Sequence, residues 1–150
     1  MRVQDLMSRH PVCCRMSDTA QSVAKILRDE DIGCVPVVSS EDSKRLEGVI
    51  TDRDLCCSII AAGLDPKTTA IGPYVTGNPV TCRSEQSLDS CAKLMQVHQI
   101  RRVLIINRDM ECVGIVSQAD VARWEDGESV RRTLAEISRP AQMIKLPAAG

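Results

Sequence analysis

The stretch Gly-Val-Ile-Thr-Asp-Arg-Asp at residues 48–54 recurs as Gly-Ile-Val-Ser-Gln-Ala-Asp at residues 114–120. Each copy has a glycine, two β-branched apolar residues, a hydroxyl residue, two variable residues and an aspartate. Upstream, residues 10–15 align with residues 78–83. The copies are offset by 68 residues in the upstream segment and by 66 in the downstream one, so the first copy carries a loop two residues longer. The chain is therefore an internal repeat of two units.

Each unit has about 60 residues, which is too few to bury a large core alone, so we expect the two units to fold as one body. The formal net charge is −1 and no basic cluster occurs, which argues against a nucleic-acid-binding surface. No apolar run approaches the roughly 20 residues that span a bilayer. The N-terminal residues 1–5 also lack an apolar signal region. We therefore expect a cytoplasmic protein that is not inserted in a membrane.

The eight cysteines do not have the spacing of a metal site. Cys13 and Cys14 are adjacent, as are Cys56 and Cys57, and no Cys-x2-Cys motif with a partner pair occurs. Most of the cysteines lie in apolar runs, where a thiol behaves as a small hydrophobic group. We therefore expect reduced cysteines in the core and no metal. A reversible disulfide within an adjacent pair is an alternative, although no Cys-x-x-Cys motif supports it.

Apolar patterning predicts the element order strand, helix, strand, strand, helix in both units. In the first unit it predicts an extended stretch at 11–13, a helix at 19–30 capped by Ser17 or Asp18, strands at 34–38 and 46–50, and a helix at 51–62 ended by Gly63. In the second unit it predicts an extended stretch at 80–82, a helix from a cap at Ser84 or Ser87 to about His98, strands at 103–106 and 112–116, and a helix from Ser117.

The same pattern divides the chain into four segments. Residues 1–63 form the first repeat, 64–75 a linker, 76–126 the second repeat, and 127–150 a C-terminal extension. Within the extension we expect one more helix at roughly 128–137, followed by a loose tail.

Thr51 and Ser117 are each followed three residues later by an aspartate, Asp54 and Asp120, which is the spacing of a helix capping box. A purely structural role is therefore one interpretation. Binding is favoured because the motif occurs twice at matching places, follows a strand each time, and uses Asp, which we expect to reach back to the cap less well than Glu or Gln. A helix N-terminus suits phosphate, and a carboxylate accepts both hydroxyls of a ribose. The motif therefore predicts a ribonucleotide site in each repeat.

Together, the repeat and its motifs resemble a tandem pair of CBS domains, also called a Bateman module, from about Val3 to Trp124. The resemblance rests on the order of elements, on both copies of the motif, and on the apolar strand at residues 35–38 with its proline at Pro36. The second copy departs from this pattern at Leu104, where proline is expected. The resemblance implies a mixed α/β (α+β) fold, with two β-α-β-β-α repeats packed through their sheets in pseudo-two-fold symmetry.

The resemblance also implies a sensor with no catalytic residues and no required cofactor. CBS pairs bind adenosine ligands between the repeats: AMP, ADP or ATP, or else NAD or S-adenosylmethionine. The aspartates Asp54 and Asp120 then hold ribose, and Thr51 and Ser117 contact ribose or phosphate. The base lies among apolar residues, which correspond here to Val12, Cys13, Val35 and Pro36 in one copy and to Val80, Thr81, Val103 and Leu104 in the other.

Arginines distinguish the two expected sites. Arg101 and Arg102 align with Gly33 and Cys34, and Arg53 has an alanine as its counterpart. A guanidinium suits phosphate, while a solvated surface pair is an equal alternative. We therefore expect inequivalent sites.

The resemblance further implies a homodimer and a separate protein partner regulated in trans, and nucleic acid is not an expected partner. The competing interpretation is a structural or oligomerisation module with empty clefts, in which the motifs are only helix caps.

Overall fold

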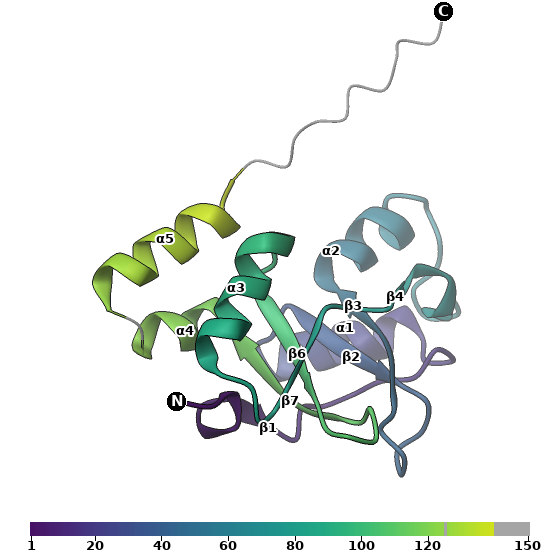
Figure 1. Cartoon of the computed structure of the whole chain (residues 1–150). Coiled ribbons are helices and arrows are strands. Elements are labelled where there is room, and N and C mark those ends of the chain that lie inside the picture. Colours follow the sequence, from purple (N-terminus) through teal and green to yellow (C-terminus); the bar gives the residue numbers. More distant parts are fainter. Residues whose placement is uncertain (125, 140–150) are drawn as a thin grey trace, which may run out of the picture.

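Two small sheets, one for each repeat, form the framework of the molecule (Figure 1). The computed structural model describes residues 1–124 and 126–139. In the first sheet the order is β2 (Cys34–Val38), β3 (Leu46–Thr51) and β4 (Thr76–Gly77). In the second the order is β1 (Ser8–Arg9), β7 (Cys112–Ser117), β6 (Arg102–Ile106) and β5 (Thr81–Arg83). The hairpins β2–β3 and β6–β7 have matching registers, because Cys34 pairs with Thr51 as Arg102 pairs with Ser117.

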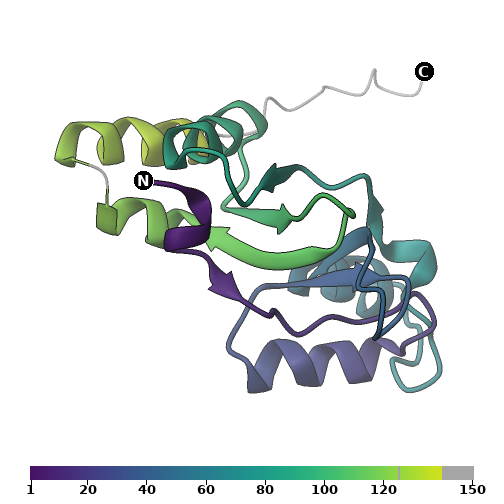
Figure 2. The ribbon, with the colours of Figure 1, turned by 60° about the horizontal axis from the view of Figure 1, so that its bottom comes forward.

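Helices cover the outer sides of the sheets. The first repeat carries α1 (Ala20–Asp29) and α2 (Asp52–Asp54), which continues as the π-helix η2 (Leu55–Ile60). The second carries α3 (Leu88–His98), α4 (Gln118–Trp124) and α5 (Gly127–Ile137). Figure 2 shows α1 and the pair α3–α5 on opposite sides of the molecule, with the strands between them. The predicted mixed α/β fold of two repeats is confirmed.

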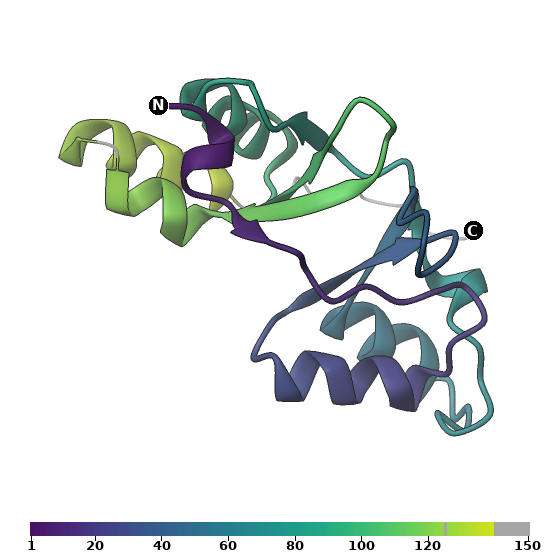
Figure 3. The same cartoon turned by 90° about the horizontal axis from the view of Figure 1, so that it is seen from below.

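The N-terminal segments of the two repeats are exchanged between the sheets. The strand β1 pairs with β7 of the second repeat, and β4 pairs with β3 of the first. The 3-10 helix η1 (Val3–Asp5) packs Val3 into the second core, whereas Ile71, just before η3 (Gly72–Tyr74), packs into the first. Figure 3 shows the N-terminal segment crossing from one repeat to the other. The boundaries 1–63 and 76–126 therefore remain a proposal about units of sequence, because segments at the start of each repeat pack against the other repeat.

Two separate cores lie under the helices, and aliphatic and thiol side chains build both. The first is centred on Val35, Ile50 and Ile59, and the second on Met95 and Ile105. Five of the eight cysteines are buried, as expected for thiols in apolar runs: Cys14, Cys34, Cys82, Cys91 and Cys112. No helix among the described residues is long and apolar enough to cross a membrane.

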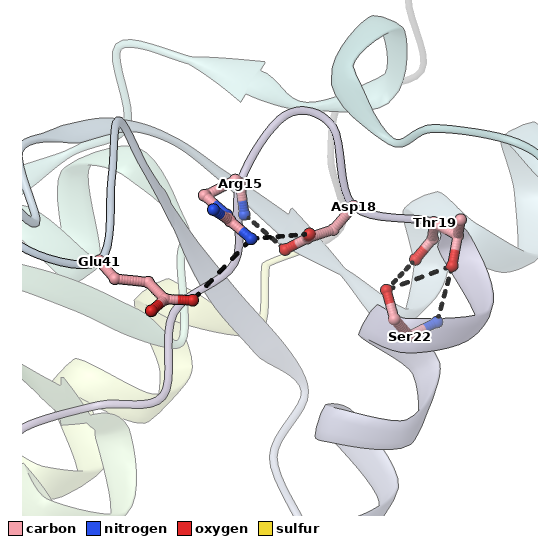
Figure 4. A network of polar contacts seen from close by, with 5 residues as sticks. All are labelled: Arg15, Asp18, Thr19, Ser22 and Glu41. Carbon is pink, nitrogen blue, oxygen red and sulfur yellow. Dashed lines mark hydrogen bonds and ion pairs between the residues drawn. The ribbon is translucent and has the colours of Figure 1, made fainter.

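Helix capping follows the predicted chemistry but not always the predicted residue. Thr19, rather than Ser17 or Asp18, caps α1, because its Oγ1 accepts the N–H of Ser22 (3.2 Å; Figure 4). Asp18 instead closes the preceding turn, where its carboxylate accepts the N–H of Arg15 (2.8 Å).

Later caps fit the sequence pattern more closely. Ser87 caps α3 as predicted, and the helix predicted at 128–137 is α5. The predicted helix at 51–62 is α2 together with η2, and Gly63 follows it at φ +74°. The predicted tail at 140–150 lies outside the described residues.

Candidate functional site

A cleft of about 950 Å³ lies between the repeats, at the upper end of the size range of ligand sites. Both repeats contribute to its walls. The first supplies the β2 start, the β3 end and the start of α2, and the second supplies the β4–β5 segment and the β6 start. The lining residues are Asp31, Ile32, Gly33, Cys34, Val49, Thr51, Asp52, Arg53, Thr76, Asn78, Pro79, Val80, Gln99, Ile100, Arg101, Arg102 and Leu104.

The motif of the first repeat reaches the cleft through Thr51, which ends β3 and caps the following helix. Its Oγ1 accepts the N–H of Asp54 (3.1 Å), and the Asp54 Oδ2 accepts the N–H of Thr51 (2.9 Å). Asp54 itself is half-buried and does not line the cleft. Its second oxygen, Oδ1, has no hydrogen bond or ion pair within the described part of the chain.

The corresponding pair in the second repeat is more fully engaged. The N–H and the hydroxyl of Ser117 both donate to Asp120 Oδ2, at 2.8 and 2.7 Å. Asp120 Oδ1 lies 3.5 Å from Arg123. Ser117 and Asp120 do not line the large cleft. The two copies of the motif are therefore in different environments.

Both aspartates reach back to the N-cap, although we expected Asp to do so less well than Glu or Gln. The backbone N–H of Thr51 and that of Ser117 point to the carboxylates at ordinary hydrogen-bond distances. The motif therefore caps a helix in both repeats, whether or not its residues also bind a ligand.

Three arginines give the cleft its positive charge. Arg53, Arg101 and Arg102 line it and are exposed, and none of them forms an ion pair with another described residue. A Cβ built on Gly33 would lie 3.0 Å from Nη1 of Arg102, so the glycine leaves space for this guanidinium. The three guanidinium groups are therefore available to an anionic ligand.

The acidic residues Asp31 and Asp52 also line the cleft. Burial raises the pKa of the Cys34 thiol; the charge of Arg102 opposes this rise and that of Asp52 adds to it. Both charges therefore lie near the same wall of the cleft. The fold brings cations and carboxylates together around one cavity.

The apolar wall of the cleft differs from the one expected for a base. Val80 and Leu104 line it as expected. Val35 and Val103 are fully buried in the two cores, Pro36 is also buried, and Thr81 is half-buried outside the lining. Side chains alternate across a strand, so the neighbouring residue Cys34 faces the cleft while Val35 faces the core.

Val12 and Cys13 line a different cavity of about 360 Å³, which is formed by residues of the first repeat only. Of the residues expected to bind nucleotide, the large cleft thus brings together Thr51, Arg53, Val80, Arg101, Arg102 and Leu104.

Sequence reasoning missed the residues at the corners of the cleft. Asp31 and Gln99 occupy matching places in the two repeats, and both have φ +52°. Asn78 is left-handed too, at φ +47°. Asn and Asp are enriched among left-handed residues, so Asp31 just after a helix and Asn78 just before a proline carried an available signal, whereas Gln99 did not. The described residues contain no group of three His, Cys, Asp or Glu side chains that could hold a metal ion.

Comparison with known proteins identifies the family to which these features belong. The family model described as the CBS domain matches residues 3–60 and 71–127. The chain is 35% identical over 137 residues to hypoxic response protein 1 of Mycobacterium tuberculosis, covering 91% of this chain and 94% of that protein. A crystal structure of hypoxic response protein I, with two coordinated zinc ions, has a TM-score of 0.74 at 33% identity and covers 83% of this chain and 99% of that one.

Two further solved structures contain adenosine compounds. The CBS domain protein PAE2072 of Pyrobaculum aerophilum, complexed with AMP, has a TM-score of 0.75 at 27% identity, covering 90% of this chain and 98% of that one. The CBS domain pair of the protein MJ0100, in complex with 5′-methylthioadenosine and S-adenosyl-L-methionine, has a TM-score of 0.72 at 27% identity, covering 82% and 94%. The repeated motif, the paired sheets and these matches show that the chain belongs to the CBS domain family, as a tandem pair.

Proposed function

We propose that this protein is a regulatory module that binds an adenosine nucleotide in the large cleft between its repeats. The observation that carries the proposal is the composition of this cleft. A helix start at Thr51, three arginines that form no ion pair with another described residue, and an apolar wall that includes Val80 meet in one cavity of about 950 Å³. The structures of the related proteins with AMP and with S-adenosyl-L-methionine support the same ligand class.

The cleft favours AMP, ADP or ATP over a ligand without phosphate. Guanidinium groups bind phosphate oxygens through paired hydrogen bonds, and Arg53, Arg101 and Arg102 surround the same space. NAD, which also carries phosphates, remains a second choice, and S-adenosylmethionine makes less use of the arginines. Thr51 contacts ribose or phosphate in this proposal, and Asp54 receives ribose through its unpaired oxygen after a small shift.

The site of the first motif is the tighter one in this proposal. Asp54 keeps one carboxylate oxygen unpaired among the described residues, while Asp120 has both oxygens engaged by Ser117 and Arg123. Titration should therefore resolve one stronger site. Two sites of equal affinity would contradict the assignment.

Isothermal titration with AMP, ADP, ATP, NAD and S-adenosylmethionine tests the ligand class. Replacing Arg101 and Arg102 together by alanine should weaken ATP binding by about tenfold or more, because a hydrogen bond to a charged group contributes roughly 1.5–3 kcal/mol. AMP binding should weaken less. The matched control is Arg108→Ala, since Arg108 is exposed in the same repeat but does not line the cleft. Equal loss in both variants would refute the phosphate role.

Nucleotide would act by binding two arrangements of the repeats with different affinity, because only differential affinity shifts an equilibrium. We propose that the output passes to a protein partner in trans, from a cytoplasmic homodimer, without catalysis by this chain. Size-exclusion chromatography with light scattering, with and without nucleotide, tests the dimer.

A second candidate function is an interaction module with empty clefts. The capping boxes favour it, since the backbone N–H groups of Thr51, Asp54, Ser117 and Asp120 already donate to side chains within the chain. Absence of any melting shift with all five ligands, in protein free of carried-over nucleotide, would favour this candidate.

A further inference from the structure

Gly33 lines the large cleft at the place in the first repeat that Arg101 occupies in the second. The N–H of Asp52 donates to the carbonyl of Gly33 (3.2 Å). In the same way, the N–H of Gln118 donates to the carbonyl of Arg101 (2.9 Å), so the two backbone positions are equivalent. Gly63 is the only described glycine with a left-handed φ. The backbone at Gly33 therefore does not require glycine, and its missing side chain has another cause.

The space beside Gly33 is filled from the second repeat. A Cβ built on Gly33 would lie 3.0 Å from Nη1 of Arg102 and 3.6 Å from its Cζ and Nη2. The guanidinium group thus lies against the backbone of the first repeat. Along β6, Arg102 shares a face with Leu104, which also lines the cleft, while Val103 between them is fully buried in the second core. The strand therefore directs Arg102 out of the second repeat and across the cleft.

Arg102 has no counter-ion in this position among the described residues. It forms no ion pair or side-chain hydrogen bond with them, although Asp31 and Asp52 line the same cleft. Its hydrogen-bond donors therefore remain free, and phosphate oxygens accept such donors in pairs. Gly33 is hydrogen-bonded to the start of α2, where Arg53 also lines the cleft. A phosphate group at this place would thus contact both repeats.

The contact between the repeats occurs in one direction only. The residue equivalent to Arg102 is Cys34, whose short side chain is buried. The residue equivalent to Gly33 is Arg101, whose long side chain fills the place that Gly33 leaves open. The first repeat therefore cannot send a guanidinium group across to the second in the same way, and the arrangement belongs to the side of the cleft that holds the first motif.

We propose, on the basis of the nucleotide function above, that Gly33 is a positioning residue that sets the preference of the cleft for polyphosphate over monophosphate nucleotides. Because Gly33 has no side chain, Arg102 reaches the first repeat and adds a third guanidinium group to those of Arg53 and Arg101. Two of these groups can hold a monophosphate, whereas the longer chain of ADP or ATP offers oxygens to all three. A larger residue in place of Gly33 would displace the guanidinium group of Arg102 and favour AMP relative to ATP.

Isothermal titration with ATP and with AMP tests this role in the parent protein, in Gly33→Val, in Arg102→Ala and in the double variant. Gly33→Val should weaken ATP binding by about tenfold, the loss expected when a hydrogen bond to a charged group is removed. It should weaken AMP binding by less than about threefold. Arg102→Ala should show the same pattern. The double variant should bind no worse than Arg102→Ala alone, because the valine then has no guanidinium group to displace.

Gly77→Val is the matched control, since Gly77 does not line the cleft and a Cβ there meets nothing within 4 Å. It should leave both affinities unchanged. Gly33→Ala should cause a smaller loss than Gly33→Val, because one methyl group displaces the flexible guanidinium group less. Thermal unfolding of each variant without ligand shows whether it is folded, and Gly33→Ala carries the same comparison with Arg102→Ala if Gly33→Val does not fold.

Two results would overturn this role of Gly33. Additive losses in the double variant would mean that the valine obstructs the ligand directly and does not act through Arg102. Equal losses for ATP and AMP in Gly33→Val would mean that the number of phosphates is not read here. A parent protein that binds neither nucleotide would instead refute the proposed function and, with it, this role.

Discussion

Replacement of Gly48 by alanine is expected to destabilise the protein strongly. Gly48 lies in β3, opposite Gly77 of the exchanged strand β4. A Cβ at Gly48 would overlap the Val75 side chain and would lie 2.6 Å from the Thr76 carbonyl oxygen. Since the second contact is with backbone, it can be relieved only by moving β4 away from β3. The glycine that opens the motif thus permits the strand exchange.

The size of the destabilisation depends on whether the added Cβ meets backbone or a flexible side chain. Overpacking in a well-packed region typically costs about 1–3 kcal/mol, and a backbone clash belongs at the upper end. A loss of about 3 kcal/mol corresponds to a fall in melting temperature of roughly 6–12 °C for a chain of this size. Gly114→Ala should cost less, because its nearest neighbour is the flexible end of Met7, with Sδ at 2.5 Å.

Chemical denaturation monitored by circular dichroism measures both variants beside Gly77→Ala as the control. A Cβ at Gly77 meets nothing within 4 Å, so this variant should lie within about 0.5 kcal/mol of the parent protein. If Gly48→Ala proved as stable as Gly77→Ala, the close approach of β4 to β3 would be wrong, and the exchange of segments would need another explanation.

Two further changes test the helices. Ile59→Ala should lower the free energy of unfolding by about 2–5 kcal/mol, because Ile59 is fully buried in η2. Ile60→Ala should change it by less than about 0.5 kcal/mol, since Ile60 is 56% exposed. Urea unfolding measures both variants, and equal losses would contradict the π-helical register. The N–H of Ser129 holds the pKa of Asp126, the α5 cap, below its ordinary value, so the stabilisation by the cap is present above the unfolded-state pKa and is lost as the pH falls through the lowered pKa. Asp126→Ala should therefore lower the melting temperature at pH 7 and progressively less as the solution becomes more acidic. A pH-independent difference would refute a charged cap.

Part of the candidate site was predictable from residues that act locally. Thr51 caps the helix that follows β3 whether or not it also binds a ligand, because its capping partner Asp54 lies only three residues further along the chain. Arg101 and Arg102 reach the cleft because they precede and open β6. Val35 and Val103 were expected beside the ligand, but they are buried in the cores. Adjacent residues of a strand face opposite sides, and sequence similarity alone does not indicate which side faces the ligand.

The sequence by itself determined the repeat, the order of elements, most helix caps and the family resemblance. These depend on short-range periodicity and on hydrogen bonds between residues three or four positions apart. Only the tertiary structure decided that β1 and β4 exchange sheets and that Thr51 and Arg102 share one cleft. Those contacts join distant segments, and their partners are fixed by how the two cores pack, which no local pattern records.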